Sequence, residues 1–297
     1  MNPAIHLRVP ELYKGAIFLI ITVFFWGTSF IFVKIGLEEV PPVTLALLRF
    51  AIAIPLLFAL MHRSGSKSPT DGREREWGPL LFLGFTGVTM YHLFQNVGMG
   101  YTSASESSVI IASNPVFIAL FGRILLGERL SKAKAAGIII AFCGVVLVVV
   151  RDGVAFSSSS FLGDMICLGS VFSWVAYSLY TKKRLLRSSP LEITAYSSLF
   201  GTIFLAPIAV AAEGLAIPAL PASWISIIVL GVFSSALGYL LWNRALSEIA
   251  ASEAGMYLFL IPIIASVSAF LFLGERLDLL FFAGSALVIT GLILSTR

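Results

Sequence analysis

The stretch Leu126-Gly127-Glu128-Arg129-Leu130 recurs as Leu273-Gly274-Glu275-Arg276-Leu277, 147 residues further along the chain. The same offset pairs Gly84 with Gly231, Asn96 with Asn243, Ser105 with Ser252, Glu106 with Glu253, Pro115 with Pro262, Gly137 with Gly284 and Gly144 with Gly291. Upstream the offset becomes 148, and it pairs Trp26 with Trp174 and Pro42 with Pro190. A chain built twice from one unit predicts two pseudo-symmetric halves with a functional site between them.

The composition is that of a membrane protein. Hydrophobic residues make up 58% of the 297 residues and charged residues only 12%, with a mean hydropathy of +0.95. A soluble domain has about 25% charged residues, so most of this apolar surface must face lipid. The net charge of +4 does not indicate nucleic-acid binding, because the basic residues lie in short links between apolar runs. The two cysteines suggest neither a disulfide framework nor a metal cluster, and no cofactor is expected.

Ten apolar segments have about the 20 residues that a membrane-spanning helix needs. They are residues 13–36, 42–61, 77–100, 104–126, 131–150, 161–183, 190–212, 222–243, 250–273 and 277–295. The serine run at 157–160 is the natural joint, and it divides the chain into a first repeat, 1–156, and a second repeat, 157–297. We therefore predict an all-α integral membrane protein of ten transmembrane helices in two five-helix repeats.

Lysine and arginine gather on one side of the predicted membrane protein. That side holds Arg8 and Lys14 before the first span, and most of the basic residues of the second, fourth and sixth links. Basic residues favour the cytoplasmic side, so both chain termini are expected there. Because each half has an odd number of spans, the second half must be inverted relative to the first. We expect a multi-pass protein of a bacterial inner membrane, acting as a monomer.

Several short motifs identify a known family. The first span carries Trp26-Gly27-Thr28-Ser29-Phe30, the second carries Leu48-Arg49-Phe50, and the fourth carries Ser113-Asn114-Pro115. Together with the repeated Leu-Gly-Glu-Arg-Leu turn, they resemble the EamA branch of the drug/metabolite transporter superfamily over nearly the whole chain. The resemblance implies a ten-helix inverted-repeat fold and the movement of small metabolites, often amino acids and frequently outward. The chain is similar in particular to the YddG-type exporters of aromatic and other amino acids.

The second half departs from this pattern. Arg49 aligns with Ser197, and Asn114 aligns with Ile261. The two halves are therefore not expected to contribute equally to the site.

Polar and aromatic residues near the middle of the spans are the candidates for a substrate-binding cavity, because polar groups at that depth need protein or cavity partners. The set comprises Trp26, Thr28, Tyr91, His92, Gln95, Asn114, Trp174, Tyr177, Tyr239 and Tyr257, with Trp242 facing the same space. Hydrogen bonding between helices and buried core packing are the alternative explanations.

Two further pairs are candidates for gating or structural roles. Arg49 is about 10 Å deep by helical rise, and Glu106 begins a span on the same side, so we predict that they interact. A local capping box formed by Ser103 and Glu106 is the alternative. Pro115 and Pro262 lie within repeat-related spans, where each is either a static kink or a hinge for gating.

The predicted cavity is rich in aromatic and amide groups, without lysine or arginine at its centre. This favours neutral or zwitterionic solutes over phosphorylated ones, which need compensating positive charge. The runner-up is a proton-coupled exporter of drugs or cationic compounds, because aromatic faces attract cations. No acidic residue lies at the centre of a span, which favours facilitated diffusion and leaves His92 a hydrogen-bonding role. Neither H-E-x-x-H nor G-x-S-x-G occurs, so an intramembrane enzyme is not supported.

Overall fold

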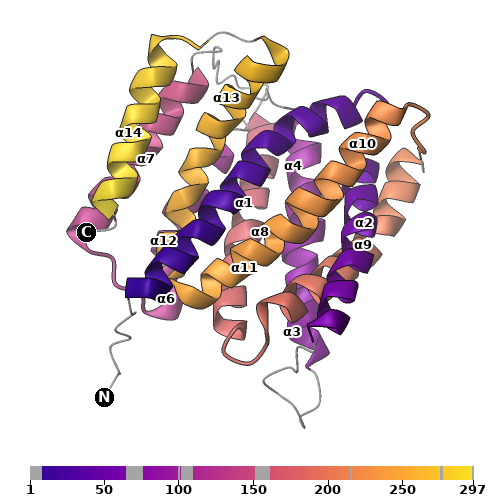
Figure 1. The fold of residues 1–297 in the computed structure, drawn as a ribbon, viewed down its shortest axis with the longest axis horizontal. Helices are drawn as coiled ribbons and strands as arrows, with labels where there is room; N and C mark the ends of the chain where they lie inside the picture. Colours follow the sequence, from indigo (N-terminus) through magenta and orange to yellow (C-terminus); the bar gives the residue numbers. More distant parts are fainter. Residues whose placement is uncertain are drawn as a thin grey trace.

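A computed structural model describes residues 9–64, 76–99, 101, 110–150, 161–214, 216–274 and 277–295. Within these ranges the chain forms ten helical segments, as predicted, packed into one bundle (Figure 1). The segments of the first half are α1 (Val9–Gly36), α2 (Pro42–Arg63), the continuous run α3 (Trp77–Gly84), η1 (Phe85–Met90) and α4 (Tyr91–Met99), then α6 (Asn114–Leu126) and α7 (Lys132–Val150).

The second half repeats this order. Its segments are α8 (Phe161–Arg184), α9 (Pro190–Glu213), the run α10 (Pro221–Val229), η2 (Leu230–Gly238) and α11 (Tyr239–Glu248), the run α12 (Ala251–Tyr257), η3 (Leu258–Leu260) and α13 (Ile261–Leu273), and α14 (Leu279–Ser295). Among the described residues, seven helices are long and apolar enough to cross a membrane, and two shorter apolar helices cover 114–126 and 279–295. Large apolar side chains stand exposed on the outside, such as Leu125 at 66% and Phe272 at 74%, as lipid-facing residues do.

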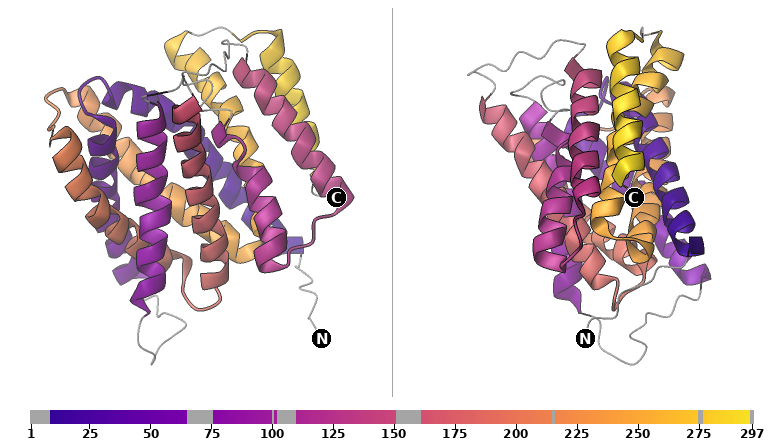
Figure 2. Two further views of the ribbon diagram at one scale, coloured as in Figure 1. Left: turned by 180° about the vertical axis from the view of Figure 1, so that it is seen from behind. Right: turned by 90° about the vertical axis from the view of Figure 1, so that its left-hand side faces the viewer.

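The packing of α7 against α14 displays the inversion of the two halves. These helices lie side by side at one edge of the bundle (Figures 1 and 2). A Cβ atom added to Gly137 would lie 2.5 Å from the Gly291 carbonyl oxygen, and one added to Gly144 would lie 2.6 Å from the Gly284 carbonyl oxygen. The contacts run in opposite directions along the two helices, so the helices are antiparallel. Gly137 thus meets Gly291, the repeat partner of Gly144, and Gly144 meets Gly284, the repeat partner of Gly137. A two-fold axis between inverted halves requires this exchange.

A second pair of contacts obeys the same symmetry. Gly84 in α3 packs on Ser197 and Gly201 of α9, while its repeat partner Gly231 in η2 packs on the backbone of Arg49 in α2. Since α2 and α9 are themselves repeat partners, one helix of each half packs against the other half. The two halves therefore pack into each other, and helices from both surround the centre of the bundle.

Four spans are interrupted, in two repeat-related pairs. The third and eighth spans each contain a π-helix, η1 and η2, which the sequence analysis did not predict. The fourth span has a turn at residues 112–113 directly before α6, and the ninth has the 3-10 turn η3 directly before α13. Pro115 and Pro262 are the second residues of α6 and α13. Both prolines therefore lie at helix starts, where the missing N–H leaves no hydrogen bond unmade.

Replacing Pro115 or Pro262 by alanine tests the hinge hypothesis. An alanine supplies the missing N–H and allows the α-helix to continue through the interruption, so we expect slower transport by a protein that still folds. The measurement is solute flux in proteoliposomes, normalised to monodisperse protein. Pro207→Ala is the matched control, because Pro207 is exposed within the uninterrupted helix α9. Unchanged flux in both hinge variants would leave only the static kink.

Three glutamates accept hydrogen bonds from backbone N–H groups at the starts of helices that are distant from them in the sequence. The Glu213 carboxylate accepts hydrogen bonds from Val43 N at 3.0 Å and Thr44 N at 2.7 Å, at the start of α2. Glu39 accepts one from Leu220 N at 3.1 Å, before α10. A hydrogen bond from Ser223 and backbone donors near Leu220 lower the pKa of the Glu39 carboxyl. Free N–H groups at a helix start attract negative charge, which explains these pairings.

The third capping residue is Glu128, which lies in the repeated Leu-Gly-Glu-Arg-Leu turn. Gly127 ends α6 and Gly274 ends α13, with φ angles of 67° and 69° in the left-handed region that favours glycine. Glu128 then accepts hydrogen bonds from Ala251 N at 2.7 Å and Ser252 N at 2.9 Å. A turn of the first half therefore holds the start of α12 in the second half. The turn thus both ends a helix and links the two halves.

Glu128→Ala should lower the free energy of unfolding by about 1–2 kcal/mol, since it removes the acceptor of two backbone N–H groups at a helix start. Thermal unfolding in detergent, followed by loss of the monodisperse peak, measures the change. Glu38→Ala, at an exposed position in the link between α1 and α2, is the control and should unfold like the unmodified protein. Equal unfolding temperatures for the two variants would mean that the cap contributes nothing.

Candidate substrate site between the halves

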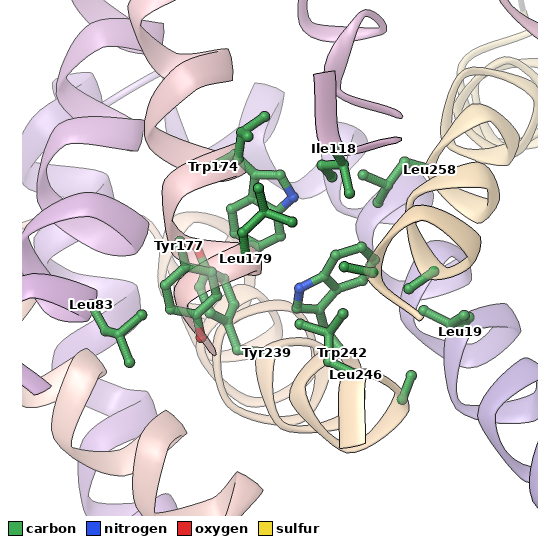
Figure 3. Packing of buried hydrophobic residues seen from close by; sticks show 14 of the residues in the cluster. Leu19, Leu83, Ile118, Trp174, Tyr177, Leu179, Tyr239, Trp242, Leu246 and Leu258 are labelled. Carbon is green, nitrogen blue, oxygen red and sulfur yellow. The ribbon is translucent and has the colours of Figure 1, made fainter. Parts of the chain in front are cut away.

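Aromatic side chains from both halves meet at the centre of the bundle. They are Trp26 on α1, Tyr91 on α4, Trp174 and Tyr177 on α8, and Tyr239 and Trp242 on α11, and we call them the aromatic cluster. The Trp26 and Trp174 rings, which are repeat partners, lie 5.3 Å apart, centroid to centroid, and nearly perpendicular. Figure 3 shows Trp174, Tyr177, Tyr239 and Trp242 converging from two helices. Such edge-to-face contacts are favourable and position the rings.

Trp174 is the central ring of the cluster. Its centroid lies 5.2 to 5.6 Å from those of its neighbours Trp26, Tyr91, Tyr177, Tyr239 and Trp242. The cluster is closed in this structure, since Trp174 is 4% exposed, Tyr239 3%, and Tyr177 and Trp242 0%. A solute could enter only if the rings separate. The cavity itself stays a prediction, and this structure shows its candidate residues in contact with one another.

Two polar atoms of the cluster bind backbone carbonyls of the two π-helices. Trp26 Nε1 donates to the Ser234 carbonyl in η2 at 3.1 Å. The Tyr239 hydroxyl donates to the Gly87 carbonyl in η1 at 2.9 Å. A Cβ atom on Gly87 would collide with the Tyr177 ring, so glycine is needed there. The widened turns of a π-helix alter the backbone pairing and often occur at functional sites, which explains why both lie here.

A buried polar network lies below the rings on the side of the second half. Asn243 Nδ2 donates to the Tyr177 hydroxyl at 2.8 Å and to Thr194 Oγ1 at 2.8 Å. Asn243 is 0% exposed. Its repeat partner Asn96 instead donates to the Pro42 carbonyl at 3.1 Å. The two halves therefore use the same residue type differently, as expected from their unequal sequences.

His92 extends the cluster toward α2. The His92 and Tyr91 ring centroids are 5.0 Å apart, and His92 lies 5.2 Å from Phe50, whose ring in turn lies 5.5 Å from Tyr239. His92 Nδ1 donates to the Val88 carbonyl at 2.9 Å, one turn earlier. This contact is the hydrogen-bonding role that the sequence suggested for His92.

Arg49 is buried beside the same rings. Its Nε donates to Ser235 Oγ at 2.7 Å, and its Nη2 donates to Ser234 Oγ at 2.6 Å. The side chain is 9% exposed. The sequence analysis expected no positive charge at the centre of the site, and Arg49 brings one there because its long side chain extends from α2 to η2. The predicted partner, Glu106, lies outside the described residues, so that pairing stays a prediction.

The remaining predicted residues lie around the cluster. Thr28 donates to the Phe24 carbonyl of its own helix at 2.8 Å, and Gln95 is half-buried on α4. Tyr257 belongs to the same buried core as Trp174. Asn114 is 4% exposed, and its Nδ2 donates to the Ile111 carbonyl at 2.9 Å. Asn114 Oδ1 is buried without a hydrogen-bond partner among the described residues.

Sequence reasoning missed three polar residues of this site: Ser234, Ser235 and Asn243. Asn243 could have been found, because it repeats Asn96 of the polar third span. The two serines carry no such signal, because small hydroxyl residues are common wherever membrane helices pack. Among the described residues, no group of three or more histidine, cysteine, aspartate or glutamate side chains could hold a metal ion.

Comparisons with known proteins place this architecture. The sequence model of the EamA-like transporter family matches residues 13–150 and again 161–297. An uncharacterized transporter of Archaeoglobus fulgidus is 34% identical, over 95% of this chain and 97% of that protein. A probable terminal-alkyne amino-acid exporter of Streptantibioticus cattleyicolor is 31% identical, over 97% and 95% respectively. A probable amino-acid metabolite efflux pump of Escherichia coli is 28% identical, over 94% and 93%. One solved crystal structure shares the fold, with a TM-score of 0.84 at 20% identity, over 97% of this chain and 98% of that one.

Proposed function

Because this chain belongs to the EamA-like transporter family, a family of membrane transporters and not of enzymes, we propose that it exports small neutral or zwitterionic metabolites, aromatic amino acids included. The observation that carries the proposal is the aromatic cluster, built from both halves around Trp174. Aromatic faces stack on apolar or aromatic solutes, and the few polar groups around them fix the orientation. Two relatives named for amino-acid export support the same substrate class.

Transport proceeds by alternating access across the cluster. Inverted repeats allow the same protein to open to either side by moving one half against the other. The interruptions at η1, η2 and η3 and before α6 are the places where helices can bend without losing regular hydrogen bonds. The contacts of Trp26 with Trp174 and of Tyr239 with Gly87 must break and form again in each cycle.

The protein spans a bacterial inner membrane with both termini in the cytoplasm. This orientation rests on the preference of basic residues for the cytoplasmic side of a membrane. Lys183 and Arg184 at the end of α8, and Arg187 just after it, are examples of the basic residues that gather on one side. A reporter that fluoresces only in the cytoplasm, fused after Arg297, would be fluorescent in intact cells. A dark fusion combined with an active periplasmic phosphatase fusion would reverse the orientation.

Proteoliposomes test the proposed function directly. Vesicles loaded with unlabelled L-phenylalanine should take up labelled L-phenylalanine by exchange, faster than protein-free vesicles. The flux should be the same with and without a pH gradient, because the described residues of the core around the cluster include no acidic side chain for a proton relay. Exchange of an organic cation, driven by a pH gradient, without exchange of any amino acid would instead establish the drug-exporter alternative. The buried guanidinium of Arg49 beside the rings disfavours that alternative, since it repels cations.

A further inference from the structure

We propose that the Arg49 guanidinium binds the carboxylate of the transported solute, so that a free carboxylate is required for efficient transport. The inference rests on the proposed function and sharpens it, since it names the chemical group that the transporter recognises. It assigns to Arg49 a substrate-binding role in place of the gating or structural role expected from the sequence. The observations that carry it are the burial of the charge, its hydrogen bonds and its position beside the aromatic cluster.

The charge of Arg49 is buried and lacks a counter-ion within the described part of the chain. Only 9% of the residue is exposed, within a span of the bundle. Both hydrogen-bond partners, Ser234 Oγ and Ser235 Oγ, are neutral hydroxyls. Among the described residues, no carboxylate lies within 4.0 Å of the guanidinium. An arginine at membrane depth is costly without an anion, and such residues mark substrate or ion pathways.

The hydrogen bonds leave part of the guanidinium free to hold a ligand. A guanidinium has five N–H donors, and the two bonds to the serines use the Nε donor and one donor on Nη2. Within the described part of the chain, no hydrogen bond uses the other Nη2 donor or the two donors on Nη1. Adjacent N–H groups on two nitrogens form the planar fork that binds a carboxylate with two parallel hydrogen bonds. The serines therefore orient the fork without occupying it.

The position of Arg49 matches a solute that has a carboxylate at one end and an apolar group at the other. Ser234 joins the two parts of the site, because its hydroxyl accepts from Arg49 and its carbonyl accepts from Trp26 Nε1. The Phe50 ring lies below the guanidinium, with its centroid 5.9 Å from Cζ. The Phe50 ring in turn lies 5.5 Å from the Tyr239 ring of the cluster, centroid to centroid. A carboxylate on Arg49 would thus place the rest of an amino acid against the aromatic cluster.

A purely structural role is the competing explanation. Arg49 links α2 to η2, and the backbone of these elements is already in close contact, since a Cβ on Gly231 would lie 2.8 Å from the Arg49 carbonyl oxygen. If the side chain served only to join these helices, its loss would lower stability and slow the transport of every solute equally. A carboxylate receptor would instead change which solutes are transported. Selectivity therefore separates the two explanations.

The test compares L-phenylalanine with L-phenylalanine amide, which lacks the carboxylate, in exchange by proteoliposomes. The unmodified protein should exchange phenylalanine at least about tenfold faster than the amide, because a charge-assisted pair is lost. Arg49→Gln should slow phenylalanine exchange by about tenfold and should not slow amide exchange, because the amide carries no carboxylate and its ammonium gains nothing from the guanidinium. Arg49→Lys should fall between, since an ammonium keeps the charge without the fork. The control is Arg187→Gln, because Arg187 is 65% exposed and bonded to Glu76.

Each outcome decides the question. Equal exchange of phenylalanine and the amide by the unmodified protein overturns the role of Arg49 and leaves the proposed function intact. Slower exchange of both solutes by Arg49→Gln, in equal proportion, also overturns it in favour of the structural role. Exchange of neither solute, nor of other amino acids, by the unmodified protein contradicts the proposed function itself. If Arg49→Gln does not fold, the comparison of the two solutes on the unmodified protein still decides.

Discussion

Trp174→Ala is expected to raise the half-saturating concentration of L-phenylalanine by about tenfold or more. One aromatic contact contributes about 0.5–1.5 kcal/mol, and about 1.4 kcal/mol corresponds to a factor of ten in affinity. Trp174 contacts five other rings of the cluster, so its loss also releases Trp26 and Tyr239 from their positions. The measurement is the concentration dependence of exchange in proteoliposomes, normalised to folded protein.

Two matched variants keep this prediction decisive. Trp174→Phe retains a ring at the centre of the cluster and should keep most of the activity even if the alanine variant unfolds. Trp224→Ala removes a tryptophan that is 38% exposed near the start of α10 and is not part of the aromatic cluster, so this variant should transport normally. An alanine variant of Trp174 that folds and saturates like the unmodified protein would exclude the cluster as the binding site.

Gly144→Ala and Gly284→Ala should each destabilise the protein by about 1–3 kcal/mol, the usual cost of extra atoms in a packed interface. The added Cβ of each would lie 2.6 Å from the carbonyl oxygen of the other glycine, and a backbone atom cannot turn aside as a side chain can. Because the two glycines face each other across α7 and α14, their effects should be similar in size. Thermal unfolding in detergent measures both.

Gly78→Ala is the matched control for these variants. No atom lies within 4 Å of a Cβ at Gly78, and alanine is a better helix former than glycine by about 1 kcal/mol, so this variant should unfold at the same temperature or higher. Normal stability of Gly144→Ala and Gly284→Ala would contradict the close antiparallel contact of the two helices.

The main features of the fold could be predicted from the sequence, because they depend on local properties of the chain. The offset of 147 residues revealed the duplication, and the length of each apolar run gave the spans. The inversion followed from the odd number of spans in each half. Pro115 and Pro262 lie directly after two interruptions, since a proline restricts the backbone wherever it occurs, and whether they act as hinges stays a prediction.

The details of the site depend on contacts between distant segments, and the sequence did not predict them. The π-helix η1 is formed where the Gly87 carbonyl binds the Tyr239 hydroxyl of the other half, a pairing that has no local signal. The charge of Arg49 reaches the cluster because η2 supplies two serines to hold it. Likewise Glu128, in a turn of the first half, binds the start of α12. Packing decides which side chains meet, so the residue types at the site could be predicted from the sequence but their contact partners could not.

Photo-crosslinking tests most directly whether the solute binds between the two halves. Proteoliposomes are irradiated with a diazirine analogue of phenylalanine, with and without excess L-phenylalanine, and the labelled residues are found by mass spectrometry. Our account predicts labels on α1, α8 and η2, near Trp26, Trp174 and Ser234, that excess phenylalanine suppresses. Labels confined to the outward faces of α7 and α14, or labels that phenylalanine does not suppress, would contradict it.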